Sequence, residues 1–217
     1  MKTNLLLAMT AVLLSVCAPA HAATECYFEK THDAVDLNID NLVFQNVVAP
    51  KSGYAAISPA GGMSITPTDD NITSNCDLGQ DGQALRAKNN RPASTDYKYV
   101  SVTDASGNSH HAVLYRTTAQ GIYYTVKITN DACTDNSGFI PPDNSYVKLY
   151  DVGDSKERKC LNGAKHFTFG VKFYVSPEYK GAKGTFRSNE TIHGSFNISG
   201  AVDEVAVRSV IFNATLK

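Results

Sequence analysis

The stretch AVDLNIDNLVF, residues 34–44, decides the fold class. Its apolar residues Val35, Leu37 and Ile39 alternate with polar residues. Because successive side chains of a β-strand point to opposite faces, this alternation predicts a half-buried strand with one face against a core. A helix would instead place its apolar residues three or four positions apart.

The other apolar segments have the same character. They are short, rich in β-branched and aromatic residues, and separated by Gly, Asn, Asp and Pro. The pattern predicts an all-β sandwich or barrel. The stretch 83–90, QALRAKNN, is the best candidate for a helix, and the acidic segment 70–82 is expected to be a solvated loop. The further expected strands are 53–58, 62–67, 97–104, 111–117, 121–130, 146–152, 166–177, 194–199 and 205–216.

The first 22 residues have the features of a secretory signal peptide. Lys2 precedes an uncharged, mostly apolar run at 5–16. Residues 20–22, AHA, supply a small-x-small cleavage signal, and the apolar run is too short to span a bilayer. An alternative is a lipoprotein acylated at Cys17, although Val16 stands where a lipobox has Gly or Ala.

Cleavage after residue 22 leaves a mature chain, residues 23–217, without a clear linker or internal repeat. We expect one β-sandwich domain over this range. The formal net charge of the whole sequence is −1. This balance gives no electrostatic footprint for nucleic acid. No later apolar run is long enough for a transmembrane helix, so we expect no membrane insertion.

The mature chain contains four cysteines, Cys26, Cys76, Cys133 and Cys160. An even number of cysteines in an exported protein predicts disulfides. Four cysteines allow three pairings, and we favour Cys26–Cys76 with Cys133–Cys160, because sequential pairing closes two separate loops. The second bond would span the turn-rich segment 131–145. None of the cysteines forms a CxxC pair, which argues against redox catalysis and zinc ribbons.

The sequence contains no catalytic signature such as GxSxG, HExxH or GxxxxGK[ST]. On a strand, the adjacent His110 and His111 point to opposite faces and cannot chelate one ion together. One of them could join His32, His166 or His193 in a metal site, but exposed histidines near a turn are the simpler interpretation. We therefore expect no enzyme activity, no cofactor and no metal.

Tyrosine is the notable aromatic residue, with eleven copies and no tryptophan. Exposed Tyr and Asn near loops suit recognition, because they combine flat contact area with hydrogen bonding. Alternation places Tyr123 and Tyr124 on opposite faces of their strand, so one of them is expected in the core. The candidate ligand-binding residues surround the turn after 97–104 and are Tyr97, Asn108, His110 and His111.

Three stretches resemble bacterial chaperone–usher fimbrial proteins, in particular minor subunits and tip adhesins. VDLNIDNLVFQNVVAPKSG (35–53) is similar to the early strand pair after the first cysteine of such proteins. GIYYTVKITNDAC (121–133) resembles their central G-x-Y-Y-x-x-x-I strand. FTFGVKFYVSPEYKG (167–181) resembles a late strand in which F-Y-V-x-P precedes a loop.

The resemblance implies an immunoglobulin-like or related β-sandwich that attaches cells to surfaces or host glycans. It also implies export through the periplasm to a fimbrium on the cell surface. The implied partners are a periplasmic chaperone, an outer-membrane usher, neighbouring fimbrial subunits and a host glycan. Pilins of this family have an incomplete sandwich, which the N-terminal extension of a neighbouring subunit completes as an added strand.

A donor extension needs roughly ten residues to run the length of a groove. Only residues 23–25 precede Cys26 after the expected cleavage, so we expect no donor strand and a position at the fimbrial tip. The chain also departs from the family pattern at its end, where Gly200 lies further in than the usual glycine and Leu216 replaces a penultimate aromatic residue. Whether the strand 205–216 borders an open groove is left open.

The expected function is that of a fimbrial minor subunit acting as a tip adhesin, which binds a carbohydrate or host-surface ligand without turnover. One alternative is a structural adaptor or capping subunit completed by donor-strand exchange. An open hydrophobic groove beside the last strand, without a concave polar pocket, would favour that alternative. Another is a secreted enzyme or inhibitor on a sandwich scaffold, because convergent sites need no motif.

Overall fold

The stretch 34–44 forms strand β2 (Ala34–Phe44), as its alternation predicts. The side chains of Val35, Leu37 and Ile39 are buried, and the polar residues between them lie on the other face. Burial of each such side chain contributes about 1.5–3 kcal/mol to folding. The buried face of this strand therefore forms part of the hydrophobic core.

The computed structural model describes most of the chain beyond the predicted signal peptide. The predictions for residues 1–22, Cys17, Cys26, His32 and Asn108 lie outside the described residues. No helix in the described part is long and apolar enough to cross a membrane. The described residues are 27–30, 34–63, 65–67, 72–76, 84–90, 97–103, 109–130, 132–133, 138–142, 144, 146–151, 160–161, 163–198 and 204–217.

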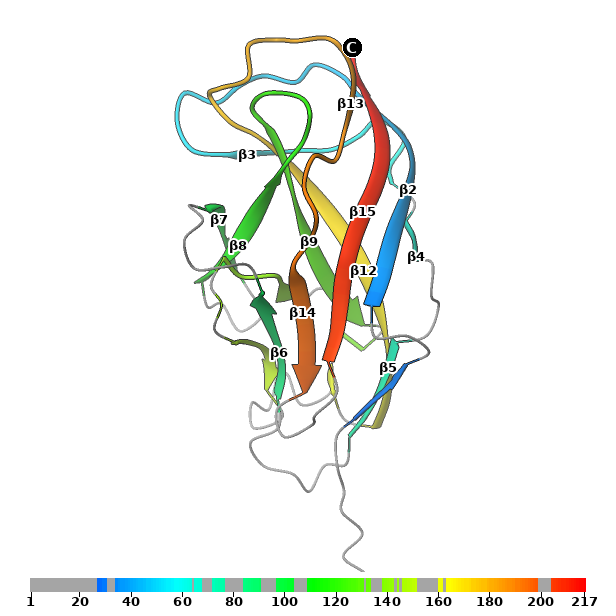
Figure 1. Cartoon of the computed structure of the whole chain (residues 1–217). Coiled ribbons are helices and arrows are strands. Elements are labelled where there is room, and N and C mark those ends of the chain that lie inside the picture. Colours follow the sequence, from blue (N-terminus) through cyan, green and yellow to red (C-terminus); the bar gives the residue numbers. More distant parts are fainter. Residues whose placement is uncertain are drawn as a thin grey trace, which may run out of the picture.

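Two β-sheets make up the described structure (Figure 1). The eight-stranded sheet has the order β1-β5-β12-β9-β8-β7, with β3 beside β12 and β10 beside β9. Its strands are β1 (Tyr27–Lys30), β3 (Ala55–Ile57), β5 (Ile72–Cys76), β7 (Lys98–Thr103), β8 (Ser109–Arg116), β9 (Ile122–Asn130), β10 (Gly138–Phe139) and β12 (Gly163–Val175).

The seven-stranded sheet has the order β11-β6-β14-β15-β2-β4, with β13 beside β15. The all-β prediction is therefore confirmed. Besides β2, the strands of this sheet are β4 (Ile65–Pro67), β6 (Ala84–Asn89), β11 (Val147–Asp151), β13 (Gly184–Arg187), β14 (Gly194–Ile198) and β15 (Glu204–Leu216).

Aromatic side chains from both sheets meet in the core. Phe212 of β15 packs edge-on against Tyr124 of β9 and Phe173 of β12, with ring centroids 5.4 and 5.2 Å apart. Phe44 of β2 lies 5.1 Å from Phe173. Edge-to-face pairs of this kind add about 0.5–1.5 kcal/mol each beyond the burial of their area. The two sheets are thus held together by one aromatic cluster.

Strand β15 has hydrogen-bonded neighbours on both of its edges. On one edge β2 runs parallel to it, in register from Ala34↔Ala206 to Phe44↔Leu216. Figure 1 shows these two strands side by side. On the other edge β14 pairs with the first part of β15 and β13 pairs with its last part. In the described structure, strand pairing on this second edge covers Glu204–Val207 and Asn213–Leu216, so strands enclose both ends of β15.

The helix predicted at 83–90 is wrong, because this segment contains strand β6. Leu85, Ala87 and Asn89 are buried, whereas Arg86 and Lys88 point away from the core. The strand pairs with β14 on one side and β11 on the other. Ala, Leu, Arg and Lys are good helix formers, but tertiary pairing outweighs that weak preference.

The solvated loop predicted at 70–82 is also incorrect for part of its length. Residues Ile72–Cys76 form β5, which pairs with β1 and β12 inside the eight-stranded sheet. Residues 70–71 and 77–82 lie outside the described residues. The polar composition of β5 gives no apolar alternation from which the strand could be recognised.

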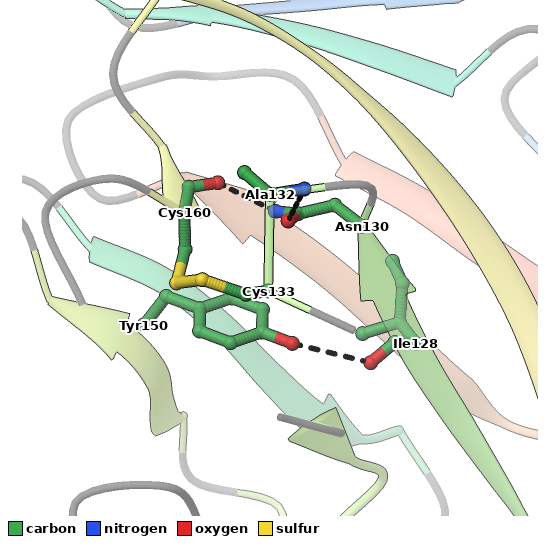
Figure 2. Close-up of a disulfide and its surroundings, with 6 residues drawn as sticks. All are labelled: Ile128, Asn130, Ala132, Cys133, Tyr150 and Cys160. Carbon is green, nitrogen blue, oxygen red and sulfur yellow. Dashed lines mark hydrogen bonds between the residues drawn. A yellow bond between two sulfur atoms is a disulfide. The ribbon is translucent and has the colours of Figure 1, made fainter. Parts of the chain in front are cut away.

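The predicted Cys133–Cys160 disulfide is present, with the two Cα atoms 5.4 Å apart (Figure 2). The side-chain amide of Asn130 donates to the Cys160 carbonyl at 2.5 Å, and its oxygen accepts from the Ala132 amide at 3.1 Å. One of the two predicted disulfides is therefore confirmed. The Cys26–Cys76 bond stays a prediction, because Cys26 lies outside the described residues.

Candidate functional site

A cavity of about 290 Å³ lies where β8 turns into β9. This turn is at the same end of the molecule as the loop after β12 and the C-terminus (Figure 1). We call this cavity between β8 and β9 the end cavity. Besides apolar residues, it is lined by aromatic and charged side chains, namely Tyr97, Lys98, Arg116, Tyr123, Glu178 and Glu190.

The turn between β8 and β9 is fixed by its own hydrogen bonds and by the loop after β12. The Thr117 hydroxyl donates to the Ile122 carbonyl at 2.9 Å. The Gly121 carbonyl accepts from the Ser176 amide at 2.9 Å. Gly121 has φ of +78°, and a Cβ there would stand 2.3 Å from the Tyr179 nitrogen. This close approach requires glycine and seats the loop that carries Glu178 beside the cavity.

Lys98, Tyr123 and Glu178 form a closed hydrogen-bonded triangle in the cavity wall. The Lys98 ammonium donates to the Tyr123 hydroxyl and to Glu178 Oε1, both at 2.6 Å. The Tyr123 hydroxyl donates to Glu178 Oε2 at 2.7 Å. The three side chains come from β7, β9 and the loop after β12. The triangle therefore ties together three segments that are distant in sequence.

The triangle also shifts the protonation equilibria of its members. The Lys98 hydrogen bond, supported by Tyr123, lowers the pKa of Glu178. Burial opposes the charged form of Lys98, but its bonds to Glu178 and Tyr123 outweigh burial and raise its pKa. The Lys98 and Glu178 side chains are 39% and 48% exposed, so their ion pair contributes at most about 1 kcal/mol to stability. The main effect of this ion pair is to fix the positions and the charged states of the Lys98 and Glu178 side chains.

A second ion pair, between Arg116 and Glu190, also lines the cavity. The Arg116 Nε donates to Glu190 Oε1 at 2.5 Å, and the hydrogen bond raises the pKa of Arg116. Glu190 is held in place because the segment after β13 is joined to the end of β8. Thr117 forms a β-bridge with Ser188, and the Asn189 amide donates to the Arg116 carbonyl at 3.1 Å.

A small aromatic cluster supports the cavity floor from outside the sandwich core. Tyr123 packs with Leu114 and Tyr174, and Tyr54 meets Tyr123 edge-on at 5.7 Å. Tyr124 instead belongs to the main core between the sheets. The prediction that these adjacent tyrosines lie on opposite faces of the strand is confirmed.

The structure separates Tyr97 from His110 and His111, the three predicted ligand-binding residues that it describes. Tyr97 lines the end cavity. His110 and His111 lie at the other end of the β7–β8 hairpin, where His110 pairs with Val102. There they border a shallow depression. Asn108 lies outside the described residues.

The remaining functional candidates were missed by sequence reasoning. Lys98, Arg116, Glu178 and Glu190 carry no motif, and the contacts that unite them span 80 and 74 residues of sequence. The proximity of Lys98 to Tyr97 along the chain was the available signal. Among the described residues, no group of three or more His, Cys, Asp or Glu side chains is placed to hold a metal ion.

A separate polar cluster lies on the seven-stranded sheet around Glu204. Its carboxylate accepts from the Asn90 amide at 3.1 Å, from the Tyr146 hydroxyl at 2.9 Å and from Lys88 at 3.1 Å. Burial favours the neutral acid, but these bonds, together with one from Ser195, outweigh burial and lower the pKa of Glu204 to about 2. We interpret the cluster as a structural one that joins β6, β14 and β15.

Comparison with known proteins finds similarity among solved structures. No protein-family model matches the chain, and no curated protein matches it significantly in sequence. Among solved structures, the chain is similar to the Proteus mirabilis ambient temperature fimbriae adhesin AtfE, with a TM-score of 0.42 and 14% sequence identity. The match covers 85% of this chain and 99% of that chain.

Proposed function

We propose that the chain is a fimbrial adhesin-type subunit that binds a carbohydrate non-covalently in the end cavity. The observation that carries this proposal is the cavity itself, in which Tyr97 and a fixed set of charged hydrogen-bonding groups surround about 290 Å³. Ligand sites combine apolar and aromatic lining with a few polar groups held in place. The volume is near the lower end of the usual range of ~300–1,000 Å³, so the cavity suits one sugar unit.

Two of the stretches that resemble fimbrial proteins also build this cavity. The stretch 121–133 contributes Gly121 and Tyr123, and the stretch 167–181 contributes Glu178. This coincidence supports a link between the resemblance and the site. On this proposal the partners are a periplasmic chaperone, an usher and neighbouring subunits, and the protein is displayed at the fimbrial tip. Weak binding at each site would be compensated by many fimbriae on one cell.

The neighbours of β15 favour an adhesin domain over a structural subunit completed by exchange. A subunit that accepts a donor strand needs unpaired backbone beside an apolar groove. In the described structure β2 runs along one edge of β15, and β14 and β13 pair with the two ends of its other edge. The chain also has the concave polar cavity that a purely structural subunit would not need.

The protonation state of Glu178 fits it to accept hydrogen bonds from a ligand. Lys98 and Tyr123 lower the pKa of Glu178 and so keep it ionised at neutral pH. This residue is therefore suited to accept hydrogen bonds from sugar hydroxyls.

The test is a glycan array with the purified mature chain and two variants. Glu178→Ala removes one member of the hydrogen-bonded triangle and should reduce binding at least tenfold. His111→Ala is the matched control, because His111 was also predicted from sequence but lies away from the end cavity. Equal loss in both variants, or binding that is unchanged in Glu178→Ala, would refute the assignment of the site.

The structural alternative has its own test. The mature chain is expressed in a periplasm with and without a fimbrial chaperone, and its solubility and mass in solution are measured. A self-complete adhesin domain should be soluble and monomeric in both cases. Aggregation without the chaperone would favour a subunit that lacks a strand.

A further inference from the structure

We propose that the end cavity selects neutral, hydroxyl-rich sugars and rejects acidic ones, such as sialylated or sulfated glycans. The proposal rests on the proposed function and adds the chemical class of its ligand. Its basis is the pairing of charges among the described lining residues, where each cation already has its own carboxylate. Lys98 is paired with Glu178, and Arg116 is paired with Glu190.

The pairing disfavours an acidic ligand in two ways. A ligand carboxylate or sulfate needs a cation, but Lys98 and Arg116 contact their carboxylate partners at 2.6 and 2.5 Å. The same partners place two negative charges in the wall, and like charges at short range repel. An acidic ligand would therefore share each cation with a carboxylate that already neutralises it, and would meet a new repulsion. Rejection by repulsion is an effective source of specificity.

The same groups fit a neutral hydroxyl well. An ammonium group donates hydrogen bonds only, and an ionised carboxylate accepts them only, whereas a hydroxyl does both. One sugar hydroxyl can thus accept from Lys98 and donate to Glu178 without separating them. The Arg116–Glu190 pair, which also lines the cavity, offers the same combination.

The apolar part of the lining suits the C–H surface of a sugar ring. Leu114, Ala119 and Ile122 line the cavity together with the half-buried Tyr97. Sites of this kind bury apolar surface against such residues and set orientation with a few polar groups. The cavity therefore combines hydrogen-bonding walls with an apolar contact surface, as a neutral sugar requires.

The experiment uses one array that carries neutral hexosides, sialylated glycans and sulfated glycans. The mature chain is compared with Glu178→Gln and Glu190→Gln, which remove one carboxylate charge each and leave the cations in place. The side chain of Glu178 is about half exposed, at 48%, so its replacement should not prevent folding. Circular dichroism confirms the folded state of each variant.

The matched control is Asp36→Asn. Asp36 is paired with Arg208 on the seven-stranded sheet, so this variant also releases an arginine from a carboxylate, but away from the cavity. The wild type should bind neutral probes, with acidic probes at least tenfold weaker. The two Gln variants should gain at least tenfold for acidic probes, and Asp36→Asn should gain nothing.

Three results would contradict the reasoning, and they differ in meaning. Preference of the wild type for acidic probes would overturn the ligand class while leaving a sugar-binding function. Failure of both Gln variants to gain acidic binding would overturn the role of the paired charges. Absence of binding to every probe would refute the proposed function itself, and with it the ligand class.

Discussion

Removal of the Cys133–Cys160 disulfide should destabilise the protein by an amount that follows from the loop it closes. The two cysteines are 27 positions apart in sequence. Closing a loop of this length removes about 3.5 kcal/mol of chain entropy from the unfolded state. Both cysteines are buried, so replacing them with alanine also loses packing worth about 1 kcal/mol.

The measurement is urea unfolding of the wild type and of the double variant Cys133→Ala/Cys160→Ala. With a slope of about 2 kcal/mol per molar urea, a loss of about 4 kcal/mol lowers the midpoint by about 2 M. Repeating the comparison in reductant separates the two contributions. Neither protein then has the bond, so only the packing loss of about 1 kcal/mol should remain.

The assay has a clear refuting result. If the oxidised wild type and the double variant unfold within ~0.3 M urea of each other, the loop-closure argument fails. If the difference is unchanged in reductant, the bond does not act on the unfolded state, and the packing around Asn130 carries the effect. That network would then be the stabilising feature of the region shown in Figure 2.

Three further predictions follow from other parts of the molecule. Gly121→Ala should destabilise by about 2–4 kcal/mol in thermal unfolding, because its Cβ would meet the Tyr179 backbone and φ is positive; an unchanged melting temperature would contradict this. In the folded protein the pKa of Glu204 is lowered to about 2. The ionised carboxylate therefore adds to the free energy of unfolding above pH 5, and this stabilisation is lost as the pH falls toward 2. Glu204→Gln should therefore cost about 1–2 kcal/mol at pH 7 and much less at pH 2, measured by urea unfolding. Non-reducing peptide mapping should recover a Cys26–Cys76 peptide, since the antiparallel β1–β5 register ends at Tyr27↔Asn75, and these two residues are the sequence neighbours of Cys26 and Cys76; free thiols at both positions would refute the pairing.

A strand is most readily predicted from sequence when it combines a period of two with one-sided burial. Residues 34–44 have both properties, so the predicted range is the observed β2. Strand β6 was missed because its Ala, Leu, Arg and Lys favour a helix, and its strand conformation depends on pairing with β11 and β14. Strand β5 was missed for the opposite reason, because its residues carry no apolar pattern at all.

The candidate site was predictable only in part, because contacts between distant segments assemble it. Tyr97 was identified from its residue type and its place near a strand end. Its neighbours Glu178 and Glu190 reach the cavity through a tight approach at Gly121 and a bridge at Thr117. Nothing local in the sequence specifies that these segments meet. Local alternation also could not show that His110 lies at the opposite end of the hairpin from Tyr97.

The pairing of β15 with β2 makes it costly for a donor strand from another subunit to bind at that edge of β15. A donor strand that replaced β2 beside β15 would have to release a strand whose Leu37 and Phe44 are fully buried. Each large apolar side chain exposed costs about 1.5–3 kcal/mol, and β2 buries five of them, so the barrier is on the order of 10 kcal/mol. Strands at the ends of the two sheets, such as β7 and β11 in the described structure, have no such neighbour to displace. If the chain is a fimbrial subunit as proposed, a neighbouring subunit that adds a strand should therefore approach a sheet end rather than the edge of β15 that β2 occupies.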